Sequence, residues 1–321
     1  MYLKHDNIDD LLREVYSELL KKEFDVFTTR SKTCEILGAV LCLENPRARL
    51  SRTESRGLPF SALGEFLWYM KGDNTLEFIE YFIPLYEKES EDGKIFGGYG
   101  PRIFNMRGIN QIDNVANLLH SRPTSRRAVI QLFNAEDIHV IDRKEVPCTC
   151  TLQFFIRKDR LDMITHMRSN DAFKGLPHDI FAFTMLQEFL ASRLTVGLGT
   201  YMHMVGSLHL YEVDADQATK YLSLGFQSRQ NYMPSMPTSD NTKDISYLLD
   251  IEAKVRKRLP VSFEISNLSP YWADLGRLLC IYRLAKDGNV NEIATLRGAM
   301  DSKVYDTYIE KRLANLQKKS I

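Results

Sequence analysis

The sequence has no excess of charge of either sign and no long apolar run. Its 42 basic residues balance 42 acidic residues, so the formal net charge is zero. A neutral chain has no general electrostatic attraction to a nucleic-acid polymer or an anionic membrane. No apolar run approaches the ~20 residues of a membrane-spanning helix, and residues 1–6 contain no secretory apolar core. We therefore expect neither nucleic acid nor membrane as a partner, and a cytoplasmic location.

Cysteine is scarce, and metal-binding motifs are missing. The five cysteines are odd in number and unevenly spaced, which is typical of free thiols in a reducing compartment. The sequence contains no Cys-x-x-Cys, no His-x-x-x-His and no carboxylate cluster with ligand spacing, so it predicts no metal site. Residues 96–100 are glycine-rich but lack the Lys-Ser/Thr pair of a phosphate-cradling loop. With 321 residues, 44% of them apolar, the chain can bury a substantial core, and a soluble enzyme is the natural expectation.

Apolar spacing divides the chain into elements. Helical spacing predicts helices over residues 8–22, 61–70, 179–195, 269–287 and 301–318. Alternation and enrichment in β-branched or aromatic residues predict strands over residues 34–41, 127–134, 150–158 and 202–213. A polar run at 228–243, broken by two prolines, predicts a linker. We therefore expect a catalytic domain over residues 1–227 and a mostly helical C-terminal extension over residues 228–321.

Two cysteines near a predicted strand are candidate nucleophiles. Cys148 follows a proline at the start of the strand, where its sulfur can react if a nearby cation lowers the pKa of the thiol. Cys150, two residues along, is expected on the same strand face, so spacing does not choose between them. A buried structural cysteine is the common alternative for both.

Three further blocks carry polar side chains suited to a nucleotide. Arg168-Ser169 and Ser125-Arg126-Arg127 can bind phosphate, because a guanidinium donates two parallel hydrogen bonds and a hydroxyl adds another; ordinary surface ion pairs are the alternative. His209 and Tyr211 share one face of a strand, where they suit a sugar hydroxyl or simply a satisfied pair inside a sheet. Asp179, at the start of an apolar helix, is either the helix N-cap or a buried carboxylate that reads a base.

Together these blocks resemble the thymidylate synthase superfamily. The family's cysteine motif, Pro-Cys-x-x-x-x-Gln-Phe, is matched by Pro147, Cys148, Gln153 and Phe154, which identifies Cys148 as the nucleophile. The likeness covers roughly residues 8–225 and includes residues 65–73, Tyr99-Gly100, Ser125-Arg126-Arg127, Arg168-Ser169-x-Asp171, Gly175-Leu176-Pro177 and Gly206-x-x-His209-x-Tyr211. It implies an α/β fold of the α+β type, with a large mixed sheet at a homodimer interface and the helical C-terminal extension added to it.

The departures from that pattern concern the base. Thymidylate synthases have Asn at Asp179, His at Thr149, Gln at Met167 and Asp at Ser207, and this chain is instead similar to phage deoxycytidylate hydroxymethylases. Uracil offers one donor and one acceptor, which an amide matches. Cytosine offers its N4 amino group and, once protonated in the C6 adduct, N3 as a second donor, and a carboxylate accepts from both. The resemblance and Asp179 therefore predict a cytosine nucleotide.

The resemblance also implies a role for each site residue. Cys148 is expected to add to C6 of the nucleotide, so that C5 attacks the one-carbon unit of 5,10-methylenetetrahydrofolate, the expected co-substrate. The other expected catalytic residues are Glu65, which also meets the folate and organises proton transfers, Asp179, and Tyr99, which helps to remove the C5 proton. The expected substrate-binding residues are Arg168 and Ser169, Arg126 and Arg127 from the partner subunit, Gln153, Asp179, His209, Tyr211 and, less strongly, Arg30. Asp171 is expected to bind the pterin.

The product is predicted from two weaker departures. Thymidylate synthases carry a tryptophan in the segment aligned with residues 81–89, where this chain has only Tyr86 nearby, and residues 318–321 lack the family's small apolar tail. Both changes favour water over hydride at the last step. We therefore expect 5-hydroxymethylation of dCMP, with CMP as the alternative substrate. The rival predictions are a C5 methylase of dCMP or dUMP, and a catalytically silent member that acts as a binding protein.

Overall fold

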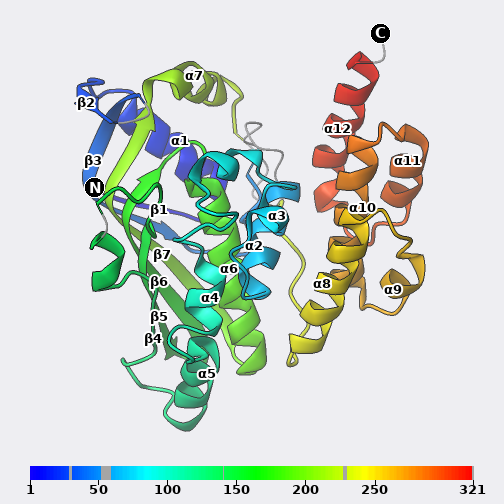
Figure 1. The fold of residues 1–321 in the computed structure, drawn as a ribbon, viewed down its shortest axis with the longest axis horizontal. Helices are drawn as coiled ribbons and strands as arrows, with labels where there is room; N and C mark the ends of the chain where they lie inside the picture. Colours follow the sequence, from blue (N-terminus) through cyan, green and yellow to red (C-terminus); the bar gives the residue numbers. More distant parts are fainter. Residues whose placement is uncertain (29–30, 52–58, 140, 227–229, 320–321) are drawn as a thin grey trace.

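A computed structural model describes residues 1–28, 31–51, 59–139, 141–226 and 230–319. Arg30 and the last two residues of the chain therefore lie outside the described part. That part combines one large mixed sheet with helices packed against it, as the resemblance implied (Figure 1). None of its helices has the combination of length and apolar character needed to cross a membrane.

The sheet has the strand order β1-β3-β7-β6-β5-β4, and β2 pairs with β3. Its strands are β1 (Tyr2–His5), β2 (Val26–Phe27), β3 (Lys32–Leu43), β4 (Val129–Gln131), β5 (Thr149–Arg157), β6 (Arg160–Asp171) and β7 (Gly197–Tyr211). Strands β6 and β7 are parallel, with Asp171 opposite His209, while β5 runs antiparallel to β6. The first residues of β5 therefore lie beside the last residues of β6 and β7, at the same end of these strands. The predicted strand over 127–134 is shorter than expected, and that over 202–213 begins earlier.

Helices from the first two thirds of the chain lie against this sheet. They are α1 (Ile8–Leu19), α2 (Phe60–Met70), α3 (Leu76–Ile79), α4 (Tyr99–Phe104), α5 (Gln111–Ser121), α6 (Leu176–Arg193) and α7 (Ala215–Ser223), with 3₁₀ turns η1 (Pro84–Glu89), η2 (Ala135–Ile138) and η3 (Glu212–Asp214). Helix α6 is buried along almost its whole length, between the sheet and α2. Pro177 lies in its first turn, where no intrahelical donor is lost. The α2–α6 pair thus forms the layer that carries Glu65 and Asp179.

The C-terminal helices form a further layer against α2 (Figure 1). They are α8 (Thr242–Arg256), α9 (Ser262–Ser266), α10 (Pro270–Lys286), α11 (Val290–Gly298) and α12 (Asp306–Lys319), with the 3₁₀ turn η4 (Lys303–Tyr305). The Tyr282 ring stacks on Phe60 and Phe82, and its hydroxyl donates to the Tyr81 carbonyl at 2.9 Å. These contacts join the helical segment to the sheet-bearing part. A domain boundary near residue 228 stays a prediction.

Candidate active site

A cavity of about 390 Å³ lies at the end of the sheet where β5 begins and where β6 and β7 end. Its walls come from α2, η1, α4, the loop before β5, the start of α6 and the three strand ends. Nine of the residues singled out in the sequence line it: Glu65, Tyr99, Cys148, Arg168, Ser169, Asp171, Asp179, His209 and Tyr211. Residues more than 140 positions apart in the chain therefore meet at one place.

A β-bulge separates the two candidate cysteines. Thr149 pairs with Met167, but Thr151 pairs with the adjacent residue of β6, His166, so Cys150 is the extra residue. Cys148 lines the cavity, whereas Cys150 is not among the lining residues. The bulge breaks the simple alternation on which the expectation of a shared face depended.

Arg168 lies directly beside the Cys148 sulfur. Its Nη2 is 3.6 Å from Sγ, and its Nε and Nη2 donate to the Pro147 and Val146 carbonyls at 2.9 and 3.0 Å. Burial raises the pKa of the Cys148 thiol to about 12, the Arg168 charge acts in the opposite direction, and the Glu145 and Asp179 carboxylates raise it further. Among the described residues, the Arg168 charge therefore does not offset burial, and the pKa of the Cys148 thiol stays raised.

Other predicted ligands lie outside the cavity. Arg126 and Arg127 are exposed and precede β4, and neither lines the cavity of its own chain. Gln153 lies on the half-exposed face of β5 and donates from Nε2 to the Arg126 carbonyl at 3.0 Å. Of the arginines expected around the phosphate, Arg168 is the one that lines this cavity among the described residues, and Arg30 lies outside them.

Asp179 belongs to a buried chain of hydrogen bonds. Helix α6 has Gly175 as its N-cap, so the alternative of Asp179 as the cap is wrong. Asn170 Nδ2 donates to Asp179 Oδ2 at 2.8 Å, and Asn170 Oδ1 pairs with His203 Nε2 at 2.9 Å. A β-carbon at Gly175 would lie 2.8 Å from Asn170 Nδ2, so a glycine is needed for this approach.

The chain of hydrogen bonds has a fixed direction. Burial lowers the pKa of His203 to about 3, so its imidazole is neutral. Because the Asn170 amide faces Asp179, its carbonyl accepts from His203 Nε2. His203 Nδ1 then accepts from the Tyr201 hydroxyl, 2.8 Å away. Asn170, His203 and Tyr201 were not singled out from the sequence as site residues. The available signal was that Tyr201 and His203 are two residues apart at the start of a predicted strand, where their side chains share a face.

The far wall of the cavity carries the pair at the end of β7. The His209 and Tyr211 rings meet edge to face at 5.2 Å, so the two side chains share a face as expected. Ser169 Oγ is 3.4 Å from His209 Nδ1. Asp171 Oδ1 accepts from the Phe173 and Lys174 amides at 2.9 and 3.0 Å, which fixes its carboxylate at the cavity edge.

The near wall contains acidic and phenolic groups. Tyr86 donates to Glu65 Oε1 at 2.7 Å, and the Tyr99 hydroxyl accepts from the Thr149 amide and hydroxyl at 3.1 and 2.9 Å. Burial raises the pKa of Tyr99 well above its usual value, so it is a neutral phenol. Glu145 was missed in the sequence, and burial raises the pKa of its carboxyl to about 7. An acidic residue three positions before Cys148 was the available signal.

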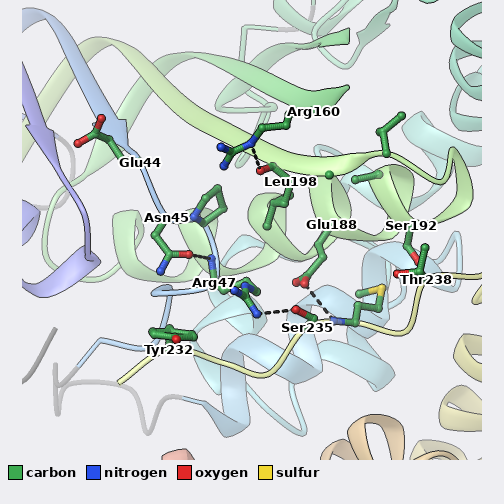
Figure 2. A pocket seen from close by; sticks show the side chains of 15 residues that line it. Glu44, Asn45, Arg47, Arg160, Glu188, Ser192, Leu198, Tyr232, Ser235 and Thr238 are labelled. Atoms are coloured by element: carbon green, nitrogen blue, oxygen red, sulfur yellow. Dashed lines mark hydrogen bonds between the residues drawn. The ribbon is translucent and has the colours of Figure 1, made fainter. Parts of the chain in front are cut away.

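A second cavity, of about 480 Å³, lies at the opposite end of β6 and β7 (Figure 2). Arg47 and Arg160 line it together with Tyr232 and Glu188. The Arg47 guanidinium packs on the Tyr232 ring, 5.1 Å from its centroid, and donates to Ser235 Oγ. None of the residues predicted to act in catalysis or binding lines this cavity.

The fold and the first cavity define an α/β enzyme with a cysteine at the edge of a mixed sheet. In the described part, no cluster of three His, Cys, Asp or Glu side chains could hold a metal ion. Residues 10–254 match the family model described as thymidylate synthase. The chain therefore belongs to the thymidylate synthase family, whose members carry out a folate-dependent transfer of one carbon to C5 of a pyrimidine nucleotide.

Proposed function

We propose that the protein is a deoxycytidylate 5-hydroxymethyltransferase, which transfers a one-carbon unit to C5 of dCMP and completes the reaction with water. The observation that carries the choice of base is Asp179, a buried carboxylate in the same cavity as Cys148. The family supplies the reaction type, and Asp179 supplies the substrate preference.

Asp179 suits cytosine because it can only accept hydrogen bonds when ionised. A carboxylate has about four acceptor positions, so the bond from Asn170 leaves others for the N4 amino group and the protonated N3 of the adduct. Asn170 is itself held by His203, which prevents the amide from turning over. A uracil O4 would face a second acceptor there, and buried mismatches of this kind discriminate strongly.

Cys148 is proposed to add as a thiolate to C6. In the described part of one chain, the Arg168 charge does not offset the burial that raises the pKa of its thiol. Arg168 and Ser169 bind the 5′-phosphate in the proposed complex, while Arg126 and Arg127 are exposed and outside their own cavity. We infer that the two arginines serve the cavity of a partner subunit in a homodimer, where they lower the pKa of the Cys148 thiol.

The proposed dimer surface is the face of the sheet opposite α6. Its residues alternate with the buried ones and are only partly covered in one chain: Phe155, Ile164, Met202 and Met204. Half-exposed apolar side chains on a broad sheet are typical of a surface that another subunit covers. Gln153 lies on this same face, beside the Arg126 carbonyl.

The cavity residues also fit a folate. Asp171 lines the cavity and is oriented by two backbone amides that donate to its Oδ1, and a pterin presents N–H donors that a carboxylate can accept. Leu85 and Tyr86 supply apolar wall nearby. When bound, methylenetetrahydrofolate supplies the one-carbon unit. Tyr99 and Glu65 hold the protons exchanged around C5, and His209 and Tyr211 hold the sugar hydroxyl.

The test is a product assay. Purified protein is incubated with methylenetetrahydrofolate and, separately, dCMP, CMP or dUMP, and each product is identified by its mass. We expect 5-hydroxymethyl-dCMP and no dihydrofolate. Dihydrofolate formation would indicate a methylase, preferential turnover of CMP would change the substrate, and no turnover of any nucleotide would support a silent binding protein.

A further inference from the structure

Glu145 lines two adjoining spaces. One is the 390 Å³ cavity that it shares with Cys148, and the other is a smaller cavity of about 30 Å³. Tyr69, Tyr86 and Tyr99 belong to both linings as well. Glu145 is therefore part of the lining that the reacting thiol and the smaller space have in common.

A contact with the backbone at Gly97 fixes the position of the Glu145 carboxylate. The Gly97 amide donates to Glu145 Oε2 at 2.7 Å, and a β-carbon at Gly97 would lie only 2.2 Å from the same oxygen. Within the described residues, this amide is the one hydrogen-bond donor to Glu145. Three other carboxylates of the 390 Å³ cavity have side-chain or paired amide donors: Glu65 from Tyr86, Asp179 from Asn170, and Asp171 from two amides.

The smaller cavity has the size and lining of a water site. A volume of about 30 Å³ admits one water molecule, which needs two or more polar partners to remain there. Glu145 provides an acceptor, and Tyr86 and Tyr99 line the same space. Trp68 also lines the space; it is 1% exposed, and its indole N–H has no partner among the described residues. A water here would thus have both an acceptor and a candidate donor.

We propose that Glu145 is the catalytic base that takes a proton from the hydrating water, held in the space beside Tyr86 and Tyr99. This inference rests on the proposed hydroxymethyl transfer. After the one-carbon unit has reached C5, loss of the C5 proton and cleavage of the bond to the tetrahydrofolate nitrogen release tetrahydrofolate and leave the nucleotide with an exocyclic methylene and a C6–S bond. The water oxygen bonds to the methylene carbon, and its proton passes to Glu145. The electron pair of the exocyclic double bond then re-forms C5=C6 as the C6–S bond breaks, releasing the Cys148 thiolate. No oxidant or reductant is consumed.

The charges around Glu145 suit this role. Burial is the main cause that raises its pKa to about 7, Glu89 raises it further, and Arg102 and Arg168 act in the opposite direction. The other titratable and charged groups that line these cavities around Glu145 are Cys148, Tyr99 on α4, Tyr86 and Glu89 on η1, Glu65 and Tyr69 on α2, and Arg143 and Lys144 in its own loop. A base whose pKa lies near the working pH is both available and strong enough to remove a proton.

Glu145→Gln separates the water step from the earlier chemistry. The substitution keeps the size of the side chain, and its carbonyl can still accept from the Gly97 amide. With methylenetetrahydrofolate and dCMP tritiated at C5, tritium release reports Cys148 addition and C5 proton loss, while the mass of the product reports hydration. In a single turnover, with enzyme in excess over dCMP, we expect tritium release near the wild-type rate and product formation slower by about 10²-fold or more. Glu145→Asp, which keeps the carboxylate, should recover part of the product.

The pH dependence adds a readout that a structural role would not change. Because the base must be unprotonated, the ratio of product to released tritium should rise with pH through about 7 in the wild type and be flat in Glu145→Gln. Glu89→Gln removes a charge that raises the pKa of Glu145, so it should move the rise to lower pH.

Three results would overturn the assignment. Undiminished product from Glu145→Gln would show that another group activates the water. A parallel loss of tritium release and product would place Glu145 in an earlier step or in the fold. A wild-type protein that yields a methylated base and dihydrofolate would instead contradict the proposed function itself, and the water step with it.

Discussion

The cavities at the two ends of β6 and β7 differ in how their charges are compensated. In the one of about 480 Å³, Glu188 pairs with the buried Arg49, Glu44 pairs with Lys4, and Arg47 is stacked on an aromatic ring. The one of about 390 Å³ places a thiol, two arginines and several carboxylates together, and the pKa values of Glu145 and Cys148 there depart from their usual range. Perturbed groups, and not volume, identify the reacting site.

The largest expected effect is at the nucleophile. Cys148→Ser should lower turnover of dCMP by about 10⁴-fold or more, because a hydroxyl is a far weaker nucleophile at C6 than a thiolate. Cys150→Ser is the matched control, since the bulge keeps Cys150 out of the cavity lining. The rate of hydroxymethyl product formation measures both. Equal loss from the two variants would remove the distinction between the cysteines.

The second largest expected effect is on the choice between cytosine and uracil as the base. Asp179→Asn replaces two acceptors with one acceptor and one donor, which matches uracil. We expect the ratio of kcat/KM for dCMP to that for dUMP to fall by about 10³-fold. The ratio is measured in competition between the two nucleotides. An unchanged ratio would contradict the reading of Asp179, even if the absolute rate fell.

The exposed arginines test whether one chain forms a complete site. The double change Arg126→Ala with Arg127→Ala should lower kcat/KM by about 10²-fold, because two phosphate ligands are lost. If they reach the partner's cavity, mixing this variant with Cys148→Ser in denaturant and refolding should restore activity to about one quarter of wild type, since half the dimers are mixed and each has one intact site. Activity that stays at the level of the separate variants would contradict exchange across the interface.

The smallest expected effect on catalysis is that of a substitution in the 480 Å³ cavity, which lies away from Cys148. Glu188→Gln leaves the buried Arg49 without its carboxylate, which should lower the free energy of unfolding by about 3 kcal/mol. At a temperature where the variant is folded, kcat for dCMP should stay near the wild-type value. Thermal unfolding and turnover of the same preparation separate these effects. A large loss of kcat in fully folded protein would give this cavity a catalytic role.

Local patterns in the sequence located most of the site because its residues occur in short blocks. The helices carrying Glu65 and Asp179 and the strand carrying His209 follow from apolar spacing and motif. Strand β6, whose end carries Arg168, was not among the predicted strands, and only the motif pointed to that arginine. The bulge at Cys150 and the chain from Asp179 through Asn170 and His203 depend on strand register, which spacing within one segment does not specify.

Glu145 was missed for a related reason. Its pKa is set by burial and by its contact with Gly97, 48 residues earlier in the chain, and a loop glutamate looks like a solvated charge when it is seen alone. For the arginines, the sequence suggested a grouping that one chain does not form. Arg126, Arg127 and Arg168 look like one phosphate site in the sequence, but a single chain does not bring them together.

The central claim is that this member of the thymidylate synthase family hydroxymethylates a cytosine nucleotide. Its most direct test is the reaction of the protein with methylenetetrahydrofolate and an equimolar mixture of dCMP and dUMP, with every product identified by mass. The account predicts 5-hydroxymethyl-dCMP with tetrahydrofolate released and dUMP left unchanged. A methylated product with dihydrofolate, or preferential consumption of dUMP, would contradict it.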